Sequence, residues 1–569
     1  MATFNSRFLY SATSPRNPRL IVDYIKVAQQ AGFDGKEYNQ DLQANFYDTL
    51  SAQEVAGQSA GKAKDKALAG RDKLTRSPQY LGFFITQSKK PFKITEAAKL
   101  LTDSALFEDV LLHQLLKFQL PSKLHKEGPE NAGRFNIKPF LELIRLINTM
   151  GYITYQEFVL YGMTLTDYHN FDDAVARIKQ FRVEREAARK AKKSLKVFFA
   201  DKQTELFDNL YADLIKAEQF KTRESKDASY KKFKRTKMNN WRDYSDAYFR
   251  ALRETGLIVM TQGRSMQISP VRQREVDYIL ETIPREIMPV NIKRDVFDEW
   301  ITNPTLPHLL NDNPAELRQQ LIGEGVQVTE TDNLYDMKRE LAAARAKRKR
   351  ELVANQVKEL KQRNQQDIDD ILEMYQLISD DEVVDRSTMY EWNTWRAMTM
   401  INHGDIEGNF KLDDEGMPSS VASGGGGDIV GHYGDFNIAV EVTLSTGKKQ
   451  YDMESEPVTR HVGELQSKLG KPTFGIFVAD KLNDNVVDHF WTTSVLKHNV
   501  YNGRVTVIPM DTNTFIEFFK RAVARDVQPS ELQAIGEYAQ RRARETMIDD
   551  DTEEVWHQDV VNYLLETVN

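Results

Sequence analysis

Between residues 390 and 461 the sequence carries acidic residues inside apolar, β-branched segments, and no other feature constrains the fold as strongly. The clearest case is Glu441, which interrupts the run Ile438-Ala439-Val440-Glu441-Val442. Without the acid, this run is typical of a fully buried strand. Burying a carboxylate there costs several kcal/mol unless it is paired or bound to a metal. The pattern therefore predicts a sheet whose core strand carries a functional acid.

A second acid, Asp428, precedes Glu441 by thirteen residues. A β-hairpin or bent strand of that length brings two carboxylates to one point, and strand alternation places Glu441 and Thr443 on the same face. This has the form of the nuclease pattern Asp, spacer, Glu-x-Lys, with threonine where lysine is usual. An acid pair of this kind holds Mg²⁺, which stabilises charge on a phosphate and activates water. The spacing thus predicts cleavage of phosphodiester bonds.

The missing lysine leaves its role open. Glu454 or His461 is a candidate to orient the attacking water, and a second metal held partly by Glu391 and Glu454 is the alternative. Each acid also has a structural interpretation. Asp428 follows Gly424 to Gly427, where an acid caps turns, and Glu454 precedes Glu456-Pro457, where an acid favours a helix N-terminus.

Composition narrows the class of protein. With 569 residues the chain exceeds what one hydrophobic core usually serves, so we expect two to four domains. It has no cysteine, which excludes disulfides, thiolate metal sites and cysteine nucleophiles. No apolar run is long enough to cross a bilayer, and no secretion signal is evident, so we expect no membrane partner and a cytoplasmic protein.

Residues 1–170 form the first expected subdomain, with helices over 17–31 and 109–118. A hairpin is expected from Leu81-Gly82-Phe83-Phe84-Ile85 and Phe92-Lys93-Ile94, followed by Thr95 as a helix N-cap. Residues 171–290 again combine a helix with a hairpin, here with the helix first: an amphipathic helix over 230–255 precedes a hairpin over 256–268. We interpret both as winged-helix-like modules that recognise DNA.

The amphipathic helix lies in a strongly basic segment. Residues 221–242 hold nine basic side chains and two acidic ones, although the whole chain has a net charge of −7. Such a local excess neutralises phosphates even on an acidic protein. The expected DNA-binding residues are Lys234, Arg235, Lys237, Arg242 and Arg264. The alternative is a solvated charged helix face with no partner.

The remainder divides into a helical linker over 291–380 and a mixed α/β domain over 381–569. The linker prediction rests on a long charged helical pattern over 333–378 with sparse apolar positions. In the last domain we expect strands over 428–430, 436–443, 473–478 and 505–509, and helices over 388–402, 456–469, 483–496 and 512–523. A sheet flanked by helices follows, as a PD-(D/E)xK-like nuclease fold.

Three motifs of this domain resemble one known family. They are Glu391-Trp392-Asn393-Thr394-Trp395, Glu441-Val442-Thr443, and Met453-Glu454-Ser455-Glu456-Pro457-Val458-Thr459-Arg460-His461. They look like the AlwI-type restriction endonucleases, which include enzymes related to MlyI, PleI and the GAGTC-directed nicking endonucleases. Shorter likenesses extend to Ser14-Pro15-Arg16, Ile94-Thr95-Glu96-Ala97, Gln180-Phe181-Arg182, Glu184-Arg185-Glu186 and Asn303-Pro304-Thr305-Leu306-Pro307.

The resemblance implies a type IIS enzyme, with an N-terminal recognition region, a helical linker and a domain that cuts DNA at a fixed distance outside an asymmetric site. It puts the catalytic acids at Glu391, Asp428, Glu441 and Glu454, with His461 in the same motif, and it carries the same threonine in place of lysine. One cleavage domain per chain implies transient pairing of two chains on DNA, a smaller partner subunit, or nicking of one strand.

Two other classes of function remain open at this point. A DNA-binding protein with an inactive nuclease fold would bind specific sites without cutting them. An oligomeric scaffold organised by its central helix would assemble without DNA and show no salt-dependent affinity for duplex.

Overall fold

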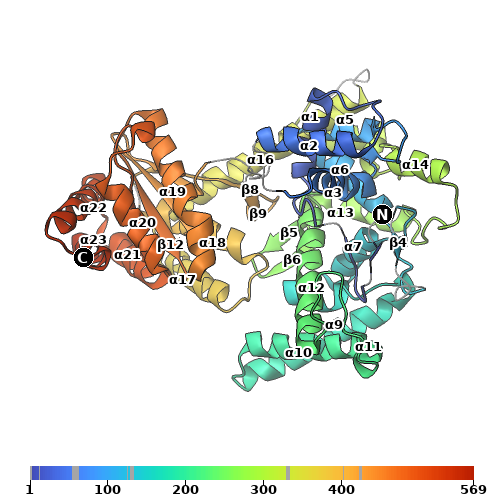
Figure 1. The fold of residues 1–569 in the computed structure, drawn as a ribbon, viewed down its shortest axis with the longest axis horizontal. Helices are drawn as coiled ribbons and strands as arrows, with labels where there is room; N and C mark the ends of the chain where they lie inside the picture. The colour runs from blue at the N-terminus through green and yellow to red at the C-terminus, as the bar shows by residue number, and fades with distance from the viewer. Residues whose placement is uncertain are drawn as a thin grey trace. The chain divides into compact units, whose positions relative to one another are not determined.

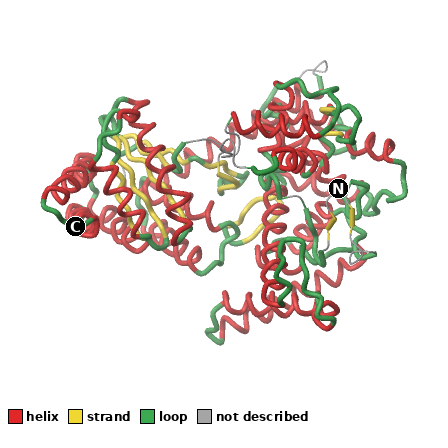
Figure 2. Tube along the Cα trace, in the orientation of Figure 1, coloured by secondary structure: helices red, strands yellow, loops and turns green. Residues whose placement is uncertain are grey.

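The computed structural model describes the chain except residues 1–2, 5, 12, 54–62, 125, 128–132, 328–332, 402 and 422–425. The chain forms two compact units, Met1–Arg348 and Lys349–Asn569. Both are mainly helical, and the one larger sheet among the described residues belongs to the second unit (Figure 1; Figure 2). None of the described helices combines the length and apolar character that a bilayer crossing needs.

The first unit is built from helices around an apolar core. Its α-helices are α1 Leu20–Gln30, α2 Gln40–Ala52, α3 Lys66–Thr75, α4 Ser77–Tyr80, α5 Glu96–Leu101, α6 Phe107–Lys117, α7 Pro139–Met150, α8 Tyr155–Glu157, α9 Phe171–Lys190, α10 Leu195–Leu210, α11 Ala212–Lys216, α12 Tyr230–Arg253, α13 Gln273–Thr282, α14 Arg294–Thr302, α15 Pro314–Gly323 and the first part of α16 Leu334–Leu360. Helix α7 shows why the core forms, because its apolar residues recur at helical spacing and Leu141, Ile144 and Ile147 are fully buried.

Short strands complete the first unit. They are β1 Thr3–Phe4 with β4 Lys126–Glu127, β2 Phe84–Ile85 with β3 Lys93–Ile94, and β5 Ile258–Thr261 with β6 Ser265–Ile268. The two expected hairpins are therefore confirmed as β2–β3 and β5–β6. Thr95 caps α5 as predicted, since its Oγ1 accepts a hydrogen bond from the N–H of Ala98 at 3.2 Å. The order of helix, then hairpin, is present at α12–β5–β6, while the winged-helix interpretation itself stays a prediction.

The second unit holds a five-stranded mixed sheet in the order β13-β12-β11-β10-β7. Its strands are β7 Asp405–Gly408, β10 Ile429–His432, β11 Asn437–Thr443, β12 Thr473–Ala479 and β13 Thr506–Asp511. Strands β11, β12 and β13 are parallel, and β10 pairs antiparallel with both β7 and β11. Every residue of β11 and β12 is buried. The fully apolar strands predicted from sequence are thus the centre of the sheet.

Helices cover this sheet, as Figure 2 shows. The helices of the second unit are the end of α16, α17 Gln365–Ser379, α18 Arg386–Ile401, α19 Gly447–Leu469, α20 Asp484–Val495, α21 Thr512–Arg525, α22 Pro529–Ile548 and α23 Glu553–Thr567, of which α18 to α23 contact the sheet. Helices α18 and α21 contact each other and the sheet, and so do α19 and α20. A separate hairpin, β8 Phe410–Leu412 with β9 Pro418–Val421, follows β7.

Most expected elements of this unit are found within a few residues of their predicted bounds. Helix α19 differs, since it begins at Gly447 and not near Glu456, and it continues through Pro457. The sequence predicted a helix beginning at Glu456 because proline, which lacks an N–H and crowds the preceding turn, is tolerated in the first turn of a helix and not in its interior. The region expected as one linker helix is divided between α16 and α17, and Leu341 of α16 packs into the core of the first unit beside Leu317 and Leu321.

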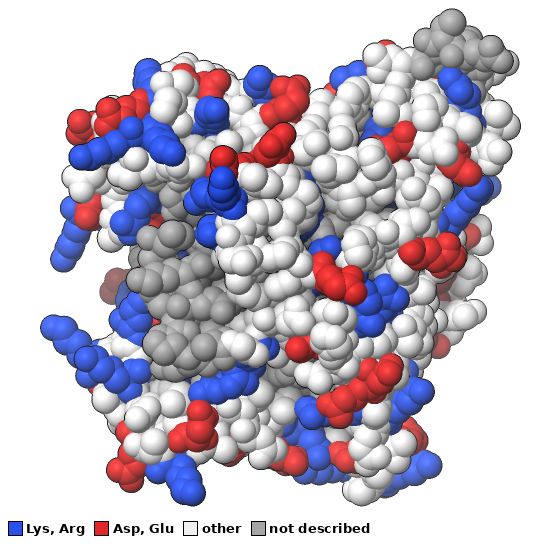
Figure 3. Space-filling model, turned by 90° about the vertical axis from the view of Figure 1, so that its right-hand side faces the viewer, with Lys and Arg blue, Asp and Glu red and all other residues white. Residues whose placement is uncertain are grey.

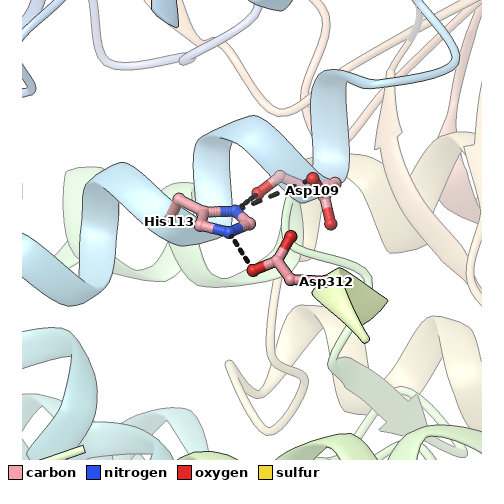
Figure 4. A group of neighbouring side chains, drawn as sticks. All are labelled: Asp109, His113 and Asp312. Carbon is pink, nitrogen blue, oxygen red and sulfur yellow. Dashed lines mark hydrogen bonds and ion pairs between the residues drawn. The ribbon is translucent and has the colours of Figure 1, made fainter. Parts of the chain in front are cut away.

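Ionic contacts hold the first part of α16 onto the first unit. The Nζ of Lys338 lies 2.7 Å from Asp109 Oδ2 and 2.7 Å from Asp312 Oδ1. His113 lies between the same acids, with Nδ1 at 2.8 Å from the carbonyl oxygen of Asp109 and Nε2 at 2.9 Å from Asp312 Oδ2 (Figure 4). Burial opposes ionisation of Asp312, but His113 and Lys338 together bring its pKa well below the usual range. Lys338 is therefore the cation that two acids in a partly buried site require.

Replacing this cation should destabilise the first unit. Lys338→Met leaves Asp109 and Asp312 short of a positive charge, and removing one partner of a buried ion pair costs about 3 kcal/mol. Scanning calorimetry should show the unfolding temperature of this unit lowered by several degrees. Arg339→Ala is the matched control, because Arg339 pairs with Asp103 and Asp336 at the exposed surface. Equal unfolding temperatures for both variants would contradict this account.

Candidate active site

The hairpin of β10 and β11 brings Asp428 and Glu441 together. In its register Ile429 pairs with Val440, so the next residues outward, Asp428 and Glu441, lie directly opposite each other. Opposite residues of an antiparallel pair have side chains on the same face, about 5 Å apart at Cβ. Asp428 Oδ2 also accepts a hydrogen bond from the N–H of Val442 at 2.9 Å. The thirteen-residue spacing is closed by a hairpin, as predicted.

Helix α19 supplies the other members. His461 Nδ1 lies 2.9 Å from Glu441 Oε1, and Glu454 Oε1 accepts a hydrogen bond from the hydroxyl of Thr443 at 2.8 Å. Glu454 and His461 are seven residues apart, which is two helical turns, so both lie on the helix face that covers β11. Sequence alternation had placed Glu441 and Thr443 on one face, and these two contacts to a single helix agree with that.

Glu391, the fourth predicted acid, is placed on α18 and is half-buried. Helix α18 packs on β7, β10 and β11. The hydrogen bonds and ion pairs that the structure gives to Asp428, Glu441 and Glu454 do not include Glu391. The structure thus places Asp428, Glu441 and Glu454 around the end of β11, with His461 bonded to Glu441, and the role of Glu391 stays a prediction.

A run of glycines directly precedes Asp428 in the sequence. Gly424 and Gly425 are outside the described residues, whereas Gly426 and Gly427 are described. A Cβ at position 427 would lie 2.7 Å from Glu441 Oε1, closer than real Cβ contacts allow. Gly427 therefore leaves the carboxylate of Glu441 where it lies, whereas a larger residue would make it shift, and the sequence alone did not reveal this.

The electrostatics of the site are those of crowded acids. Burial, and then the charge of Glu441, raises the pKa of Asp428 to about 8. Burial also raises the pKa of Glu441, although its hydrogen bond with His461 opposes the rise. The hydrogen bond to Glu441 raises the pKa of His461. Within the part of the chain that the structure describes, no Lys or Arg forms an ion pair with Asp428, Glu441 or Glu454.

These features make the network a candidate cation site. Three carboxylates provide hard oxygen ligands of the kind that divalent ions such as Mg²⁺ prefer. The high pKa of Asp428 reflects burial first and the nearby charges of Glu441 and Glu454 second, with His461 opposing the rise. The residues present therefore suit the cation that the sequence predicted at Asp428 and Glu441, with Glu391 and Glu454 as further ligands.

A different group of acids, Asp109, His113 and Asp312, also has ligand atoms within 4.8 Å of one another. Its geometry is that of a candidate metal site, as Figure 4 shows. The position between its carboxylates is, however, taken by the ammonium of Lys338 at 2.7 Å from each. Since the lysine already provides the positive charge, we interpret this group as a structural contact of α16.

The predicted DNA-binding residues differ in exposure. Arg235 is exposed, and the side chain of Arg242 is 70% exposed. Lys234 and Arg264 are half-buried, and the ammonium of Lys234 lies 3.6 Å from Asp208. On the face drawn in Figure 3, basic and acidic side chains are interspersed, so no broad basic surface is seen there.

Lys237 requires a correction. It is buried on α12, and its Nζ lies 5.7 Å from the ring centre of Tyr211 and 5.8 Å from that of Phe233. Helical periodicity turns this position inward with Phe233 and Trp241, so its ammonium lies near aromatic rings and not at the open surface expected of a phosphate contact. A basic run does not reveal from sequence which of its members faces the core.

The family model described as AlwI restriction endonuclease matches residues 79–518. Among solved structures, the small subunit of the heterodimeric restriction endonuclease R.BspD6I is 24% identical, with a TM-score of 0.28, over 35% of this chain and all of that one. The BpuJ1 endonuclease binding domain, solved with modified DNA, is 10% identical, with a TM-score of 0.31, over 50% of this chain and 90% of that one. No curated protein matches the chain.

The raised pKa of Asp428 predicts a pH-dependent cost to stability in the absence of metal. The folded state holds a proton on Asp428 between pH 3.8 and about 8 that the unfolded state releases, so stability falls as pH rises through this window. Asp428→Asn cannot ionise and keeps an oxygen for the N–H of Val442. Its advantage over the parent in EDTA should grow by roughly 2 kcal/mol between pH 6 and pH 9.

Thermal unfolding of the second unit at both pH values measures this difference. The exposed acid Asp435 provides the control, because Asp435→Asn should show the same difference from the parent at pH 6 and pH 9. A constant offset for Asp428→Asn across the range would mean that Asp428 is ionised at ordinary pH, contrary to the geometry described above.

Proposed function

Because this chain belongs to the AlwI restriction endonuclease family and is a type II site-specific deoxyribonuclease, we propose that it hydrolyses DNA at the network of Asp428, Glu441, Glu454 and His461. The observation that carries the proposal is the placement of three carboxylates around one face of β11: the hairpin register sets Asp428 opposite Glu441, and Glu454 of α19 accepts a hydrogen bond from Thr443 on that face. No described Lys or Arg is paired to any of the three. Such a charge cluster is costly unless a cation binds there.

We propose Mg²⁺ as that cation, with Asp428 and Glu441 as principal ligands and Glu454 completing the site. The donor set supports this choice, since all three offer carboxylate oxygen and the chain has no cysteine. When bound, Mg²⁺ supplies positive charge that stabilises the phosphodiester as negative charge develops and favours deprotonation of an attacking water. Glu391 extends the site in this proposal.

His461 is proposed to move the proton. With Glu441 ionised, the Nδ1–H of His461 donates to Glu441 Oε1, which leaves Nε2 as the nitrogen able to accept or release a proton. Glu441 holds the imidazole in one orientation. Its hydrogen bond also favours the protonated imidazole, which raises the pKa of His461. This residue takes the acid–base role that the absent lysine has in the Glu-x-Lys pattern.

The finer features of the activity are also proposals. We propose a type IIS enzyme with a PD-(D/E)xK-like cleavage domain, which cuts at a fixed distance outside an asymmetric site, either through both strands or as a nickase. The DNA-recognition segments are 1–170 and 171–290, the linker 291–380, and the cleavage domain 381–569. With one cleavage domain per chain, cutting both strands requires a second chain or a smaller subunit on the DNA. Nicking a single strand requires neither.

Cleavage of supercoiled plasmid in Mg²⁺ buffer tests the active site. Asp428→Ala and Glu441→Ala should each lower the cleavage rate by a factor of about 100 or more, because each removes a cation ligand. Asp435→Ala, at the exposed turn of the same hairpin, should cut at the parent rate. Nicked and linear products separate the one-strand and two-strand alternatives, and sequencing the ends gives the cut position.

Two results would count against the assignment. Cleavage by both alanine variants at the parent rate would place the chemistry elsewhere in the chain. Specific gel shifts with no nicking by the parent at any metal concentration would favour a DNA-binding protein with an inactive nuclease fold.

Exposed arginines of α12 are proposed to contact DNA phosphates, together with Lys234 and Arg264. Arg235→Ala and Arg242→Ala should each weaken binding to all sequences alike and reduce the salt slope of the association constant by about 0.9, since each removes one phosphate contact. Fluorescence anisotropy between 50 and 200 mM salt, roughly the range over which such contacts are screened, measures this slope. Arg544→Ala, at an exposed position of α22, is the control, and an unchanged slope in the α12 variants would exclude this surface.

A further inference from the structure

We propose that Thr443 is a positioning residue that fixes the carboxylate of Glu454 beside Asp428 and Glu441, so that the site orients a third acid without neutralising it. This inference rests on the proposed cation site and assigns a task to the residue that stands where the nuclease pattern has lysine.

The direction of the hydrogen bond is determined by the groups around the hydroxyl. The N–H of Ser445 donates to Thr443 Oγ1 at 3.0 Å, while Glu454 Oε1 lies 2.8 Å from the same Oγ1. Because Ser445 already uses an acceptor site of this oxygen, the hydroxyl proton is available for Glu454. Thr443 therefore donates, and Glu454 accepts through Oε1.

Thr443 is a rigid donor. It is buried at 8% exposure and ends β11, where Val442 and Thr443 pair with Val478 and Ala479 of the parallel neighbour β12. A β-branched side chain in a strand has few χ1 rotamers, so its hydroxyl is fixed with the sheet. A glutamate on a helix surface has several rotatable bonds, and a fixed donor selects one of its arrangements.

The selected arrangement directs Glu454 toward the other acids. Thr443 lies two residues after Glu441 and therefore on the same face of β11. The charge of Glu454 is among the causes that raise the pKa of both Asp428 and Glu441, which agrees with its closeness to them. Among the hydrogen bonds of the described residues, that from Thr443 engages Oε1 of Glu454 and none engages Oε2, so Oε2 is available to a cation.

A lysine at this position would act differently. Its ammonium would pair with Glu454 and cancel one negative charge, whereas a hydroxyl forms the hydrogen bond and leaves the charge in place. The threonine is thus suited to a site that gathers negative charge for a divalent cation, with the proton-handling role passed to His461. Loss of the hydroxyl alone should weaken binding of the cation without removing any ligand.

The test compares Thr443→Val, which keeps the shape and loses the hydroxyl, with Thr443→Ser, which keeps the hydroxyl. Isothermal titration of the full chain with Mg²⁺, in the absence of DNA, should show an affinity about 10- to 100-fold weaker for Thr443→Val and close to the parent for Thr443→Ser. In plasmid nicking, Thr443→Val should need a proportionally higher Mg²⁺ concentration for half-maximal rate and should recover much of the rate at saturation.

A double variant separates positioning from packing. If Thr443 acts through Glu454, adding Thr443→Val to Glu454→Gln should weaken Mg²⁺ binding no further than Glu454→Gln alone. Parent affinity in Thr443→Val, equal loss in Thr443→Ser, or additive losses in the double variant would each overturn the inference. Failure of the parent to cut plasmid would count against the proposed function, while the titrations would still decide the role of Thr443.

Discussion

The second unit depends on one unfavourable interaction, the placement of Asp428 directly opposite Glu441 on neighbouring antiparallel strands. Like charges opposite each other destabilise a sheet, and burial increases the cost. Burial, and then the charge of Glu441, raises the pKa of Asp428 to about 8, so protonation of Asp428 offsets part of this cost, and the imidazole of His461 beside Glu441 offsets another part. The remaining negative charge is the basis of the proposed cation site and hence of the chemistry.

The surrounding fold holds these groups in place from several directions. Strand β11 is buried along its whole length between β10 and β12, so Glu441 and Thr443 cannot shift in register. Helix α19 brings Glu454 and His461 to the same face through one two-turn spacing. Gly427 leaves room for the carboxylate of Glu441. Precise placement of acids by rigid elements is what a hydrolytic site requires.

Two acidic clusters among the described residues show how a paired lysine changes the charge and the pKa of the acids around it. Around Asp109 and Asp312, Lys338 lies 2.7 Å from both carboxylates, and the pKa of Asp312 is held well below its usual range. Around Asp428 and Glu441 no described lysine or arginine is paired, and the pKa of Asp428 rises. The first cluster is neutralised and structural, whereas the second retains charge that a cation can use.

The sequence by itself determined the apolar strands, the position of Glu441 within one of them, the hairpins and the family motifs, because these follow from local periodicity and residue identity. It misjudged where α19 begins, since proline normally lies in the first turn of a helix and Pro457 lies inside this one, and it could not tell that Lys237 is buried. Only the tertiary structure decided that Asp428 pairs across from Glu441, that Thr443 donates to Glu454, and that Lys338 occupies the other acidic cluster. Those contacts join residues from different elements, and their formation depends on strand register and helix packing that no local pattern encodes.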